Sequence, residues 1–293
     1  MKNVFFNSLL LLVFFSSLLS CTKDDIQEDN GPAINYDTLS RNGLILMDRH
    51  EYDLLPELDV STLQPLLPEL TSNRSSKVQL NTPPVWDQGT EGSCVSFAVG
   101  YIGVSYYLKM LKNMPYSSTG AYRSPEFLYN NTKISGNCNT GSHFTNVLNF
   151  LKSSGVCSWS QMPYSSSNGC TNKGTQVQKE QAKAGKIKSW TKVSNSVSTL
   201  RNLLYYGYPV LLGMPLDRNF DVQTKSFPYT YTSRGGSITG GHAMVIVGYD
   251  DQKKVFKVQN SWGKNVHDNG FLYISYNLMP LLNAELYYID PIR

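Results

Sequence analysis

Several patterns that mark common function classes are missing from this sequence. It contains no CxxC pair, no HExxH motif and no glycine-rich phosphate loop, and its five cysteines and four histidines are scattered along the chain. We therefore expect no metal site and no cofactor. The acidic residues are scattered too, and they form no convincing carboxylate pair for glycoside hydrolysis.

The sequence also lacks an excess of charge of either sign. The 26 basic and 22 acidic side chains leave a net charge of +4, and lysine and arginine form no concentrated block. Nucleic acid is therefore a poor candidate partner. The apolar share of 41% and the charged share of 16% are typical of a globular protein, and 293 residues suffice for one large domain or two modest ones. We expect a monomer.

A long hydrophobic run occurs only near the N-terminus. Lys2 precedes an apolar stretch from Val4 to Leu19, which is too short and too close to the N-terminus to favour a stable membrane span. We interpret residues 1–21 as a signal peptide that is not part of the fold.

The end of this run, Leu18-Leu19-Ser20-Cys21, resembles the lipobox of bacterial lipoproteins. The resemblance implies that Cys21 is acylated and anchors the protein to a membrane without spanning it. A plain secretory signal that happens to contain a cysteine is the alternative. The following Lys23-Asp24-Asp25 is similar to a signal for the outer face of the outer membrane. We therefore expect a secreted, lipid-anchored protein on the surface of a Gram-negative bacterium.

Residues 22–77 differ in composition from the rest of the chain. They are acidic at first, then carry Leu-Pro clusters, and end in a stretch rich in Ser, Asn and Arg. This pattern indicates a tether followed by a partly ordered extension. An inhibitory pro-segment is an alternative that the composition leaves open. We expect a compact domain over residues 78–293.

Apolar periodicity and capping signals predict the elements of that domain. Helices are expected from Cys94 to about Lys112, from Pro125 through Tyr129 after the N-cap Ser124, from Phe144 to Leu151 with Gly155 as the stop, and from Val197 to Tyr206. Strands are expected at Val210 to Met214, His242 to Tyr249, Val255 to Gln259 and Phe271 to Ile274. Helices thus precede strands, which favours an α+β fold with a helical lobe packed on a strand lobe.

Cys94 is the first candidate for chemistry, because it lies at the predicted start of a long helix. A free cysteine is mostly protonated at neutral pH, and the partial positive charge of a helix N-terminus favours its thiolate. Gly89 and Gly92, just before it, let backbone approach a substrate closely. Taken alone, such a cysteine is more often core packing than a nucleophile.

His242 strengthens the case for Cys94. It opens an apolar strand, and Asn260 follows the neighbouring strand, so a hairpin can place the two side chains together. The amide oxygen of Asn260 can then bind one imidazole nitrogen and leave the other for the thiol. Trp262 could cover that hydrogen bond. Of the other histidines, we interpret His143 as a helix-start or cleft-rim residue, His267 as a loop residue and His50 as lying outside the domain.

Three segments together resemble the papain-like cysteine peptidases: Gln88 to Phe97 (QGTEGSCVSF), Gly241 to Tyr249 (GHAMVIVGY) and Asn260 to Gly270 (NSWGKNVHDNG). Ser124 to Leu128, Asn137 to Gly141 and Met162 to Tyr164 are similar to that family's intervening segments, in the same order. The resemblance covers the chain from about Val78 to near its C-terminus. It implies a two-lobed α+β fold, in which a helical lobe packs against an antiparallel β-barrel-like lobe and the active site lies in the cleft between them.

The resemblance also implies residue roles. Cys94 would be the nucleophile, His242 its general base and acid, and Asn260 the residue that orients the imidazole. Gln88 would complete the oxyanion hole with the backbone N–H of Cys94. The expected substrate-binding positions are Gly92, Ser93, Gly141, Gly241 and Trp262.

The chain also departs from the family pattern. Glu91 stands where the family has a cysteine whose usual partner matches Cys138, so that disulfide cannot form here. We therefore expect a bridge between Cys157 and Cys170, with Cys138 as a free thiol, although three cysteines do not fix their own connectivity. Val266 replaces a tryptophan on the leaving-group side, so specificity there is expected to differ.

The leading hypothesis is thus a cysteine peptidase that hydrolyses peptide or protein substrates through a thioester on Cys94. Two alternatives remain open. One is a catalytically silent lipoprotein that binds peptide or another surface protein, and the other is an acyl transferase or amidase that uses the same residues.

Overall fold

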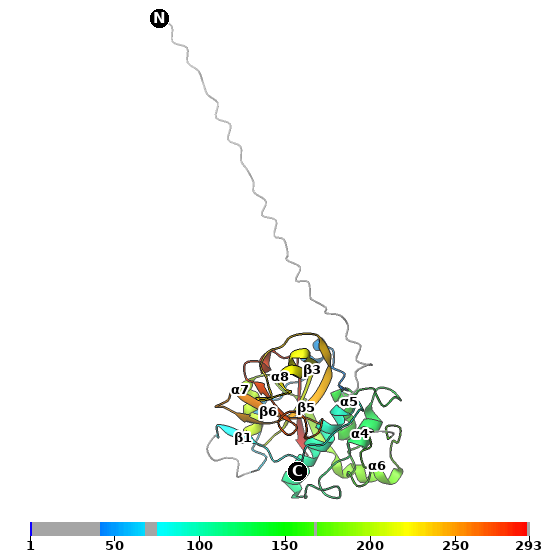
Figure 1. The fold of residues 1–293 in the computed structure, drawn as a ribbon. Coiled ribbons are helices and arrows are strands. Elements are labelled where there is room, and N and C mark those ends of the chain that lie inside the picture. Colours follow the sequence, from blue (N-terminus) through cyan, green and yellow to red (C-terminus); the bar gives the residue numbers. More distant parts are fainter. Residues whose placement is uncertain (2–41, 68–74, 167–168, 292–293) are drawn as a thin grey trace. The chain divides into compact units, whose positions relative to one another are not determined.

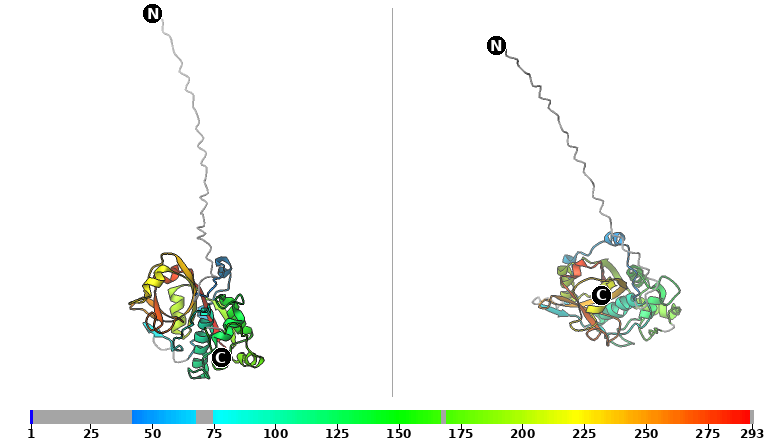
Figure 2. Two further views of the ribbon diagram at one scale, coloured as in Figure 1. Left: turned by 45° about the vertical axis from the view of Figure 1, so that its right-hand side comes forward. Right: turned by 45° about the horizontal axis from the view of Figure 1, so that its top comes forward.

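The computed structural model describes residue 1 and residues 42–67, 75–166 and 169–291. Apart from Met1, the predicted signal peptide with Cys21 therefore lies outside the described residues. All described elements belong to one compact unit, Ile34–Arg293. Figures 1 and 2 show helices α4, α5 and α6 gathered on one side of this unit and the strands β3, β5 and β6 on the other.

A long helix that begins at Cys94 packs against both groups. It consists of an α-helical turn, α2 (Cys94–Ser96), a π-helical stretch, η4 (Phe97–Val104), and α3 (Ser105–Lys112). Its composition and length would suit a membrane span, but 78% of its most apolar window is buried inside the protein, so it is a core helix. It ends where Asn113 adopts a left-handed conformation with φ of 51°.

The helical side is set by local capping signals. The Ser124 hydroxyl accepts from the backbone N–H of Phe127 at 3.0 Å, and proline follows at the first helical position. Gly155, with φ of 84°, follows the C-terminal end of α5 as predicted. The helices here are α4 (Pro125–Thr132), α5 (Phe144–Ser153), α6 (Gln176–Ala182) and the short η5 (Lys183–Gly185).

The other side is a sheet of eight strands: β1 (Lys77–Gln79), β2 (Ile187–Lys192), β3 (Val210–Asp217), β4 (Thr230–Tyr231), β5 (Ile238–Asp250), β6 (Val255–Gln259), β7 (Phe271–Ser275) and β8 (Glu285–Pro291). Their order is β2-β8-β3-β5-β6-β7-β4, with β1 also paired to β5. Every pair is antiparallel except β4 with β7. Two helices of the same region, α7 (Val197–Tyr205) and α8 (Arg218–Gln223), and the short η6 (Met279–Leu281) accompany the sheet.

The α+β class and the two-sided arrangement are confirmed, but the barrel-like form of the strand lobe is wrong. Within the described ranges, β2 and β4 end the order and no hydrogen-bonded pair joins them. β4 is only two residues long, so it offers too few backbone groups to carry the sheet around into a closed ring.

Residues 42–67 pack on this domain. They form α1 (Arg49–Asp53) and the short η2 (Val60–Thr62). The Tyr52 hydroxyl donates to the carbonyl of Leu286 at 3.2 Å and accepts from its N–H at 2.8 Å. The N–H groups of Leu58 and Leu66 donate to the carbonyls of Lys192 and Tyr206, both at 2.8 Å. This part of the extension is therefore attached along its length.

Candidate active site

Cys94 is the first residue of the long helix, and its side chain is fully buried. The preceding Ser93 has non-helical backbone angles, and its hydroxyl lies 2.7 Å from that of Tyr164. Tyr164 in turn donates to the carbonyl of Gln88 at 2.6 Å. The turn that presents the thiol is thus held by a side chain from the Met162-Pro163-Tyr164 segment.

His242 and Asn260 meet as the hairpin spacing predicted. His242 lies on β5 and Asn260 directly follows β6, and the Nε2 atom of His242 lies 2.7 Å from the Oδ1 atom of Asn260. The backbone N–H of Ser261 also donates to that Oδ1 atom at 2.7 Å. A backbone N–H can only donate, so the amide orientation is fixed and Nε2 of His242 must carry the proton. Nδ1 is then the basic nitrogen.

Trp262 packs over this pair. Its ring centroid lies 4.5 Å from that of His242, with 32° between the planes. The indole therefore covers one face of the imidazole and limits water access to the His242–Asn260 hydrogen bond. A hydrogen bond shielded from water in this way is electrostatically stronger than an exposed one.

Gln88 ties the turn before the helix to the loop after β6. Its Nε2 group donates to the Glu91 carbonyl at 2.9 Å, and its Oε1 atom accepts from the Ser261 hydroxyl at 2.6 Å. Its backbone N–H donates to the carbonyl of Ser261 at 2.8 Å. The side chain is therefore held in one orientation beside the segment that carries Cys94.

His267 has a role that the sequence reasoning missed. His267 lies in the loop between β6 and β7, as predicted, and its Nε2 atom also lies 3.0 Å from the Nδ2 atom of Asn260. Its Nδ1 atom lies 2.9 Å from the carbonyl oxygen of Thr224. The one available signal was its position, seven residues after Asn260 in the same loop.

The chain itself occupies the region where a substrate was expected. Gly43 pairs in parallel with Gly241, and Leu44 pairs in parallel with Ser142. Leu44 donates its N–H to the Gly241 carbonyl at 3.1 Å, and Ser142 donates to the Gly43 carbonyl at 2.8 Å. Segment 42–47, named the cleft segment below, therefore bridges the two sides of the site.

Predicted substrate-binding glycines lie in direct contact with the cleft segment. A Cβ atom added to Gly141 would lie 2.2 Å from the carbonyl oxygen of Gly43. A Cβ atom on Gly43 would lie 1.9 Å from the carbonyl oxygen of Gly92, so this contact permits no side chain. The fully buried Leu44 fills a space between Gly213 of β3 and Phe144 of α5.

The covered thiol is not poised to ionise. Burial raises the pKa of Cys94 to about 11, although the backbone N–H groups of Ala243 and Gly43 oppose that rise by donating to the sulfur. The backbone N–H of Gly43 thus lies against the sulfur, and the cleft segment covers the Cys94 thiol.

The predicted disulfide is wrong. The structure pairs Cys138 with Cys170, at a Cα–Cα distance of 5.4 Å, and leaves Cys157 as a buried free thiol. Glu91 lies against this disulfide. One of its carboxylate oxygens lies within 4.8 Å of the sulfurs of both Cys138 and Cys170. Because those sulfurs are bonded to each other, this cluster is no metal site.

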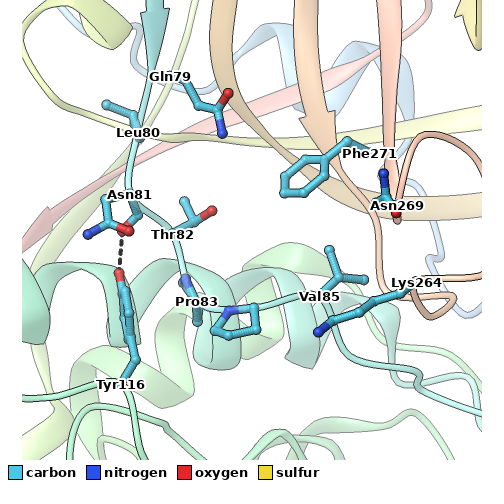
Figure 3. Close-up of a pocket in the computed structure, with 11 residues that line it drawn as sticks. Gln79, Leu80, Asn81, Thr82, Pro83, Val85, Tyr116, Lys264, Asn269 and Phe271 are labelled. Carbon is cyan, nitrogen blue, oxygen red and sulfur yellow. Dashed lines mark hydrogen bonds between the residues drawn. The ribbon is translucent and has the colours of Figure 1, made fainter.

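Two surface cavities lie near the site without containing Cys94 or His242. A cavity of about 680 Å³ lies between residues 79–85 and the β6–β7 side, where Tyr116 donates to the Asn81 carbonyl (Figure 3). Another, of about 330 Å³, is lined by Asp221, Thr224, Lys225, Trp262, Asn265, Val266 and His267. The latter brings solvent to the outer side of Trp262 and His267.

The fold is that of the papain-like cysteine peptidases. The structure of xylellain, a cysteine protease from Xylella fastidiosa, matches with a TM-score of 0.69 and 23% identity, covering 87% of this chain and 97% of that chain. Bromelain from Ananas comosus matches with a TM-score of 0.58 and 20% identity, covering 74% of this chain and all of that chain. At such identities the likeness establishes the fold alone.

The family assignment rests on a sequence match. A profile described as "Papain family cysteine protease" matches residues 67–287, which is more than half of the chain. The chain therefore belongs to the papain family of cysteine proteases. An uncharacterised peptidase C1-like protein of Acanthamoeba polyphaga mimivirus is 25% identical over 268 residues, covering 82% of this chain and 83% of that one. This membership supports cysteine peptidase activity in general.

Proposed function

We propose that this protein is a cysteine peptidase in which Cys94 is the nucleophile and His242 the general base. The observation that carries the proposal is the 2.7 Å contact between His242 and Asn260, which fixes the imidazole tautomer close to a helix that begins with a buried cysteine. A nucleophile, a base and an orienting group are the parts that acyl-transfer chemistry requires.

The proposed reaction proceeds through a thioester. The proton of the Cys94 thiol passes to Nδ1 of His242, and the thiolate attacks the scissile carbonyl carbon. The C–N bond then breaks, and the amine departs with the proton from His242. Water next attacks the thioester, giving one proton to His242, which returns it to the departing sulfur.

Gln88 and the backbone N–H of Cys94 are the proposed donors to the carbonyl oxygen as negative charge develops on it. The hydrogen bonds from Ser261 and to Glu91 keep the Gln88 amide in place before substrate arrives. Removing one donor of this kind costs about 2.7–4 kcal/mol of transition-state stabilisation.

We further propose that the described state is latent, which makes the extension an inhibitory segment and not only a tether. The cleft segment covers Cys94 and occupies Gly92, Gly141 and Gly241 by backbone contacts. The backbone N–H of Gly43 lies against the Cys94 sulfur. Activity then requires that the segment be displaced or removed.

Gly43→Val tests both parts of this proposal in the full chain. The new side chain would start 1.9 Å from a backbone oxygen, so the cleft segment must leave its site. Gly136→Val is the matched control, since a Cβ atom there meets nothing within 4 Å. We expect iodoacetamide to modify Cys94 rapidly near neutral pH in Gly43→Val and slowly in the control and the parent chain.

Cleavage of a peptide library is the second measurement. Gly43→Val should cleave peptides, and Gly43→Val with Cys94→Ala should not. An exposed Cys94 that reacts no faster than an ordinary thiol would contradict the peptidase assignment and favour the silent binding protein. Products joined to an added amine, in place of hydrolysed products, would favour the transferase.

We also propose that the protein is secreted, lipid-anchored at Cys21 and displayed on the outer membrane of a Gram-negative cell. The support is the sequence before and after that cysteine, Leu18-Leu19-Ser20 and Lys23-Asp24-Asp25. Expressed in a Gram-negative host, the protein should take up labelled fatty acid and sediment with membranes, and Cys21→Ala should lose both properties. Retention of label in Cys21→Ala would contradict the anchor.

A further inference from the structure

His267 is joined to the proposed catalytic pair through Asn260. The amide of Asn260 contacts a different imidazole on each side: its Oδ1 atom faces Nε2 of His242 at 2.7 Å, and its Nδ2 atom faces Nε2 of His267 at 3.0 Å. The Asn260 side chain is therefore held between two histidines.

The direction of these hydrogen bonds can be assigned from chemistry. The Thr224 carbonyl only accepts, so Nδ1 of His267, 2.9 Å away, carries a proton. The Nδ2 group of Asn260 only donates, so Nε2 of His267 must be the unprotonated nitrogen that accepts. The arrangement requires His267 to be neutral and to hold one tautomer.

The ring itself is fixed by its neighbours. It stacks on Trp262, with 5.7 Å between ring centroids and 30° between planes, and lies edge-on to Phe220 of α8 at 6.3 Å. The backbone of His267 is left-handed, with φ of 55°, a conformation that histidine adopts more readily than most residues. The backbone conformation and the ring contacts of His267 together hold its Nε2 atom against Asn260.

We propose that His267 is a positioning residue that holds the Asn260 amide so that its oxygen orients His242. The inference rests on the proposed peptidase function, because it assigns His267 a part in the same site. When His267 takes up a second proton, both of its ring nitrogens become donors, and Asn260 loses its acceptor. The amide is then released to turn, and His242 loses its fixed orientation.

Solvent can deliver that proton through the cavity of about 330 Å³ beside the ring. Burial lowers the pKa of His267, whereas the Thr224 carbonyl and the Asp221 carboxylate oppose the shift. Of the other charged groups, Lys225 lines the same cavity and Asp268 is the next residue in the loop. The second proton therefore binds on the acid side of neutrality.

Two substitutions separate positioning from packing, both in the full chain carrying Gly43→Val. His267→Gln offers an amide oxygen that can accept from Asn260 but does not titrate. His267→Gly offers no acceptor, and a left-handed backbone costs glycine little. We expect kcat to fall roughly tenfold in His267→Gly with KM within about twofold, and to recover to within about threefold in His267→Gln.

The pH profile is the readout that a packing role would not move. In the chain carrying Gly43→Val alone, log(kcat/KM) should fall more steeply than a slope of about 1 on the acid side, because protonation of His267 adds up to about a tenfold loss to the titration of the catalytic pair, and the slope should drop to about 1 in His267→Gln. If kcat and the slope in His267→Gly matched those of the chain carrying Gly43→Val alone, the proposal would be overturned. A His267→Gln variant as impaired as His267→Gly would overturn it too.

Nitrogen-15 NMR of the four histidines gives a readout independent of turnover in the full chain with its cleft covered. His267 should show a proton on Nδ1 and none on Nε2, and the Nε2 proton of His242 should exchange roughly tenfold faster in His267→Gly than in His267→Gln. The opposite tautomer, or unchanged exchange, refutes the positioning role. If the NMR results hold but Gly43→Val shows no Cys94-dependent cleavage, the peptidase function fails and the positioning of His242 stands.

Discussion

At the scale of single residues, Glu91 places a carboxyl group in the buried turn before Cys94. Glu91 is only 2% exposed to solvent. Burial, with the nearby Glu126 carboxylate, raises the pKa of Glu91 to about 7, while Tyr164 and Lys133 oppose the shift. The folded protein therefore disfavours the charged form, so the contribution of Glu91 to stability is greatest below pH 4.5 and is lost as the pH rises through about 7.

Glu91→Gln removes the charge and keeps the shape. We expect the free energy of unfolding to rise by about 2 kcal/mol at pH 8.5 and to differ little from the parent at pH 4.5. Urea unfolding at the two pH values measures this. Glu51→Gln, at an exposed position of α1, should change the unfolding free energy by less than about 0.5 kcal/mol at either pH. Equal effects of Glu91→Gln at both pH values would contradict the prediction.

The sequence located some residues of the site better than others. Cys94, His242, Asn260 and Gln88 lie in segments whose spacing and helix or strand positions carry information, and the structure brings His242 and Asn260 into contact. His267 could not be found in that way. Its role depends on the carbonyl of Thr224, which lies 43 positions away on another segment, and no local pattern reports such a contact.

At the scale of elements, the sequence predicted the helices and strands whose start and stop signals are local. The N-cap Ser124 with its proline, the stop at Gly155 and the strand Val255–Gln259 all lie where the sequence placed them. Strands β2 and β8 were missed. β2 pairs with β8, and β8 also pairs with β3. These partners lie far apart in the sequence, so local periodicity does not reveal their hydrogen bonds.

The disulfide is a second element-scale contact that spacing did not determine. The Cys138–Cys170 bridge closes a loop of sequence separation 32 across the helical side. Loop-closure entropy predicts that its loss lowers the free energy of unfolding by about 3–4 kcal/mol. Unfolding with and without a reducing agent measures this contribution.

Cysteine variants identify the bridge. Cys157→Ser should keep the full effect of the reducing agent, because that thiol is unpaired. Cys138→Ser with Cys170→Ser should unfold equally easily with and without it. Sensitivity that disappears in Cys157→Ser would instead support a bridge through Cys157.

At the scale of the whole molecule, residues 42–67, the described part of the extension before the domain, belong to the same folded unit as the domain. Residues 42–67 form hydrogen bonds to strands, to the end of a helix and to the proposed cleft. Their partners in these bonds lie from 97 to more than 230 positions away in the sequence. Composition alone could not separate a tether from an inhibitory segment, because that distinction depends on these long-range contacts. The sequence predicted both halves of the site but not that the chain covers it.

Leu44 should set how firmly the site is covered. It is fully buried between Phe144 and Gly213, so Leu44→Ala is expected to weaken docking of the cleft segment by about 2 kcal/mol or more. Because about 1.4 kcal/mol corresponds to a tenfold change in an equilibrium, basal peptide cleavage should rise at least roughly tenfold. Leu54→Ala makes the same change in the same extension at a side chain that is 72% exposed, and it should leave basal cleavage unchanged. If basal peptide cleavage in both variants stays at the parent level while Gly43→Val is active, the cleft segment is held by its backbone contacts and not by Leu44.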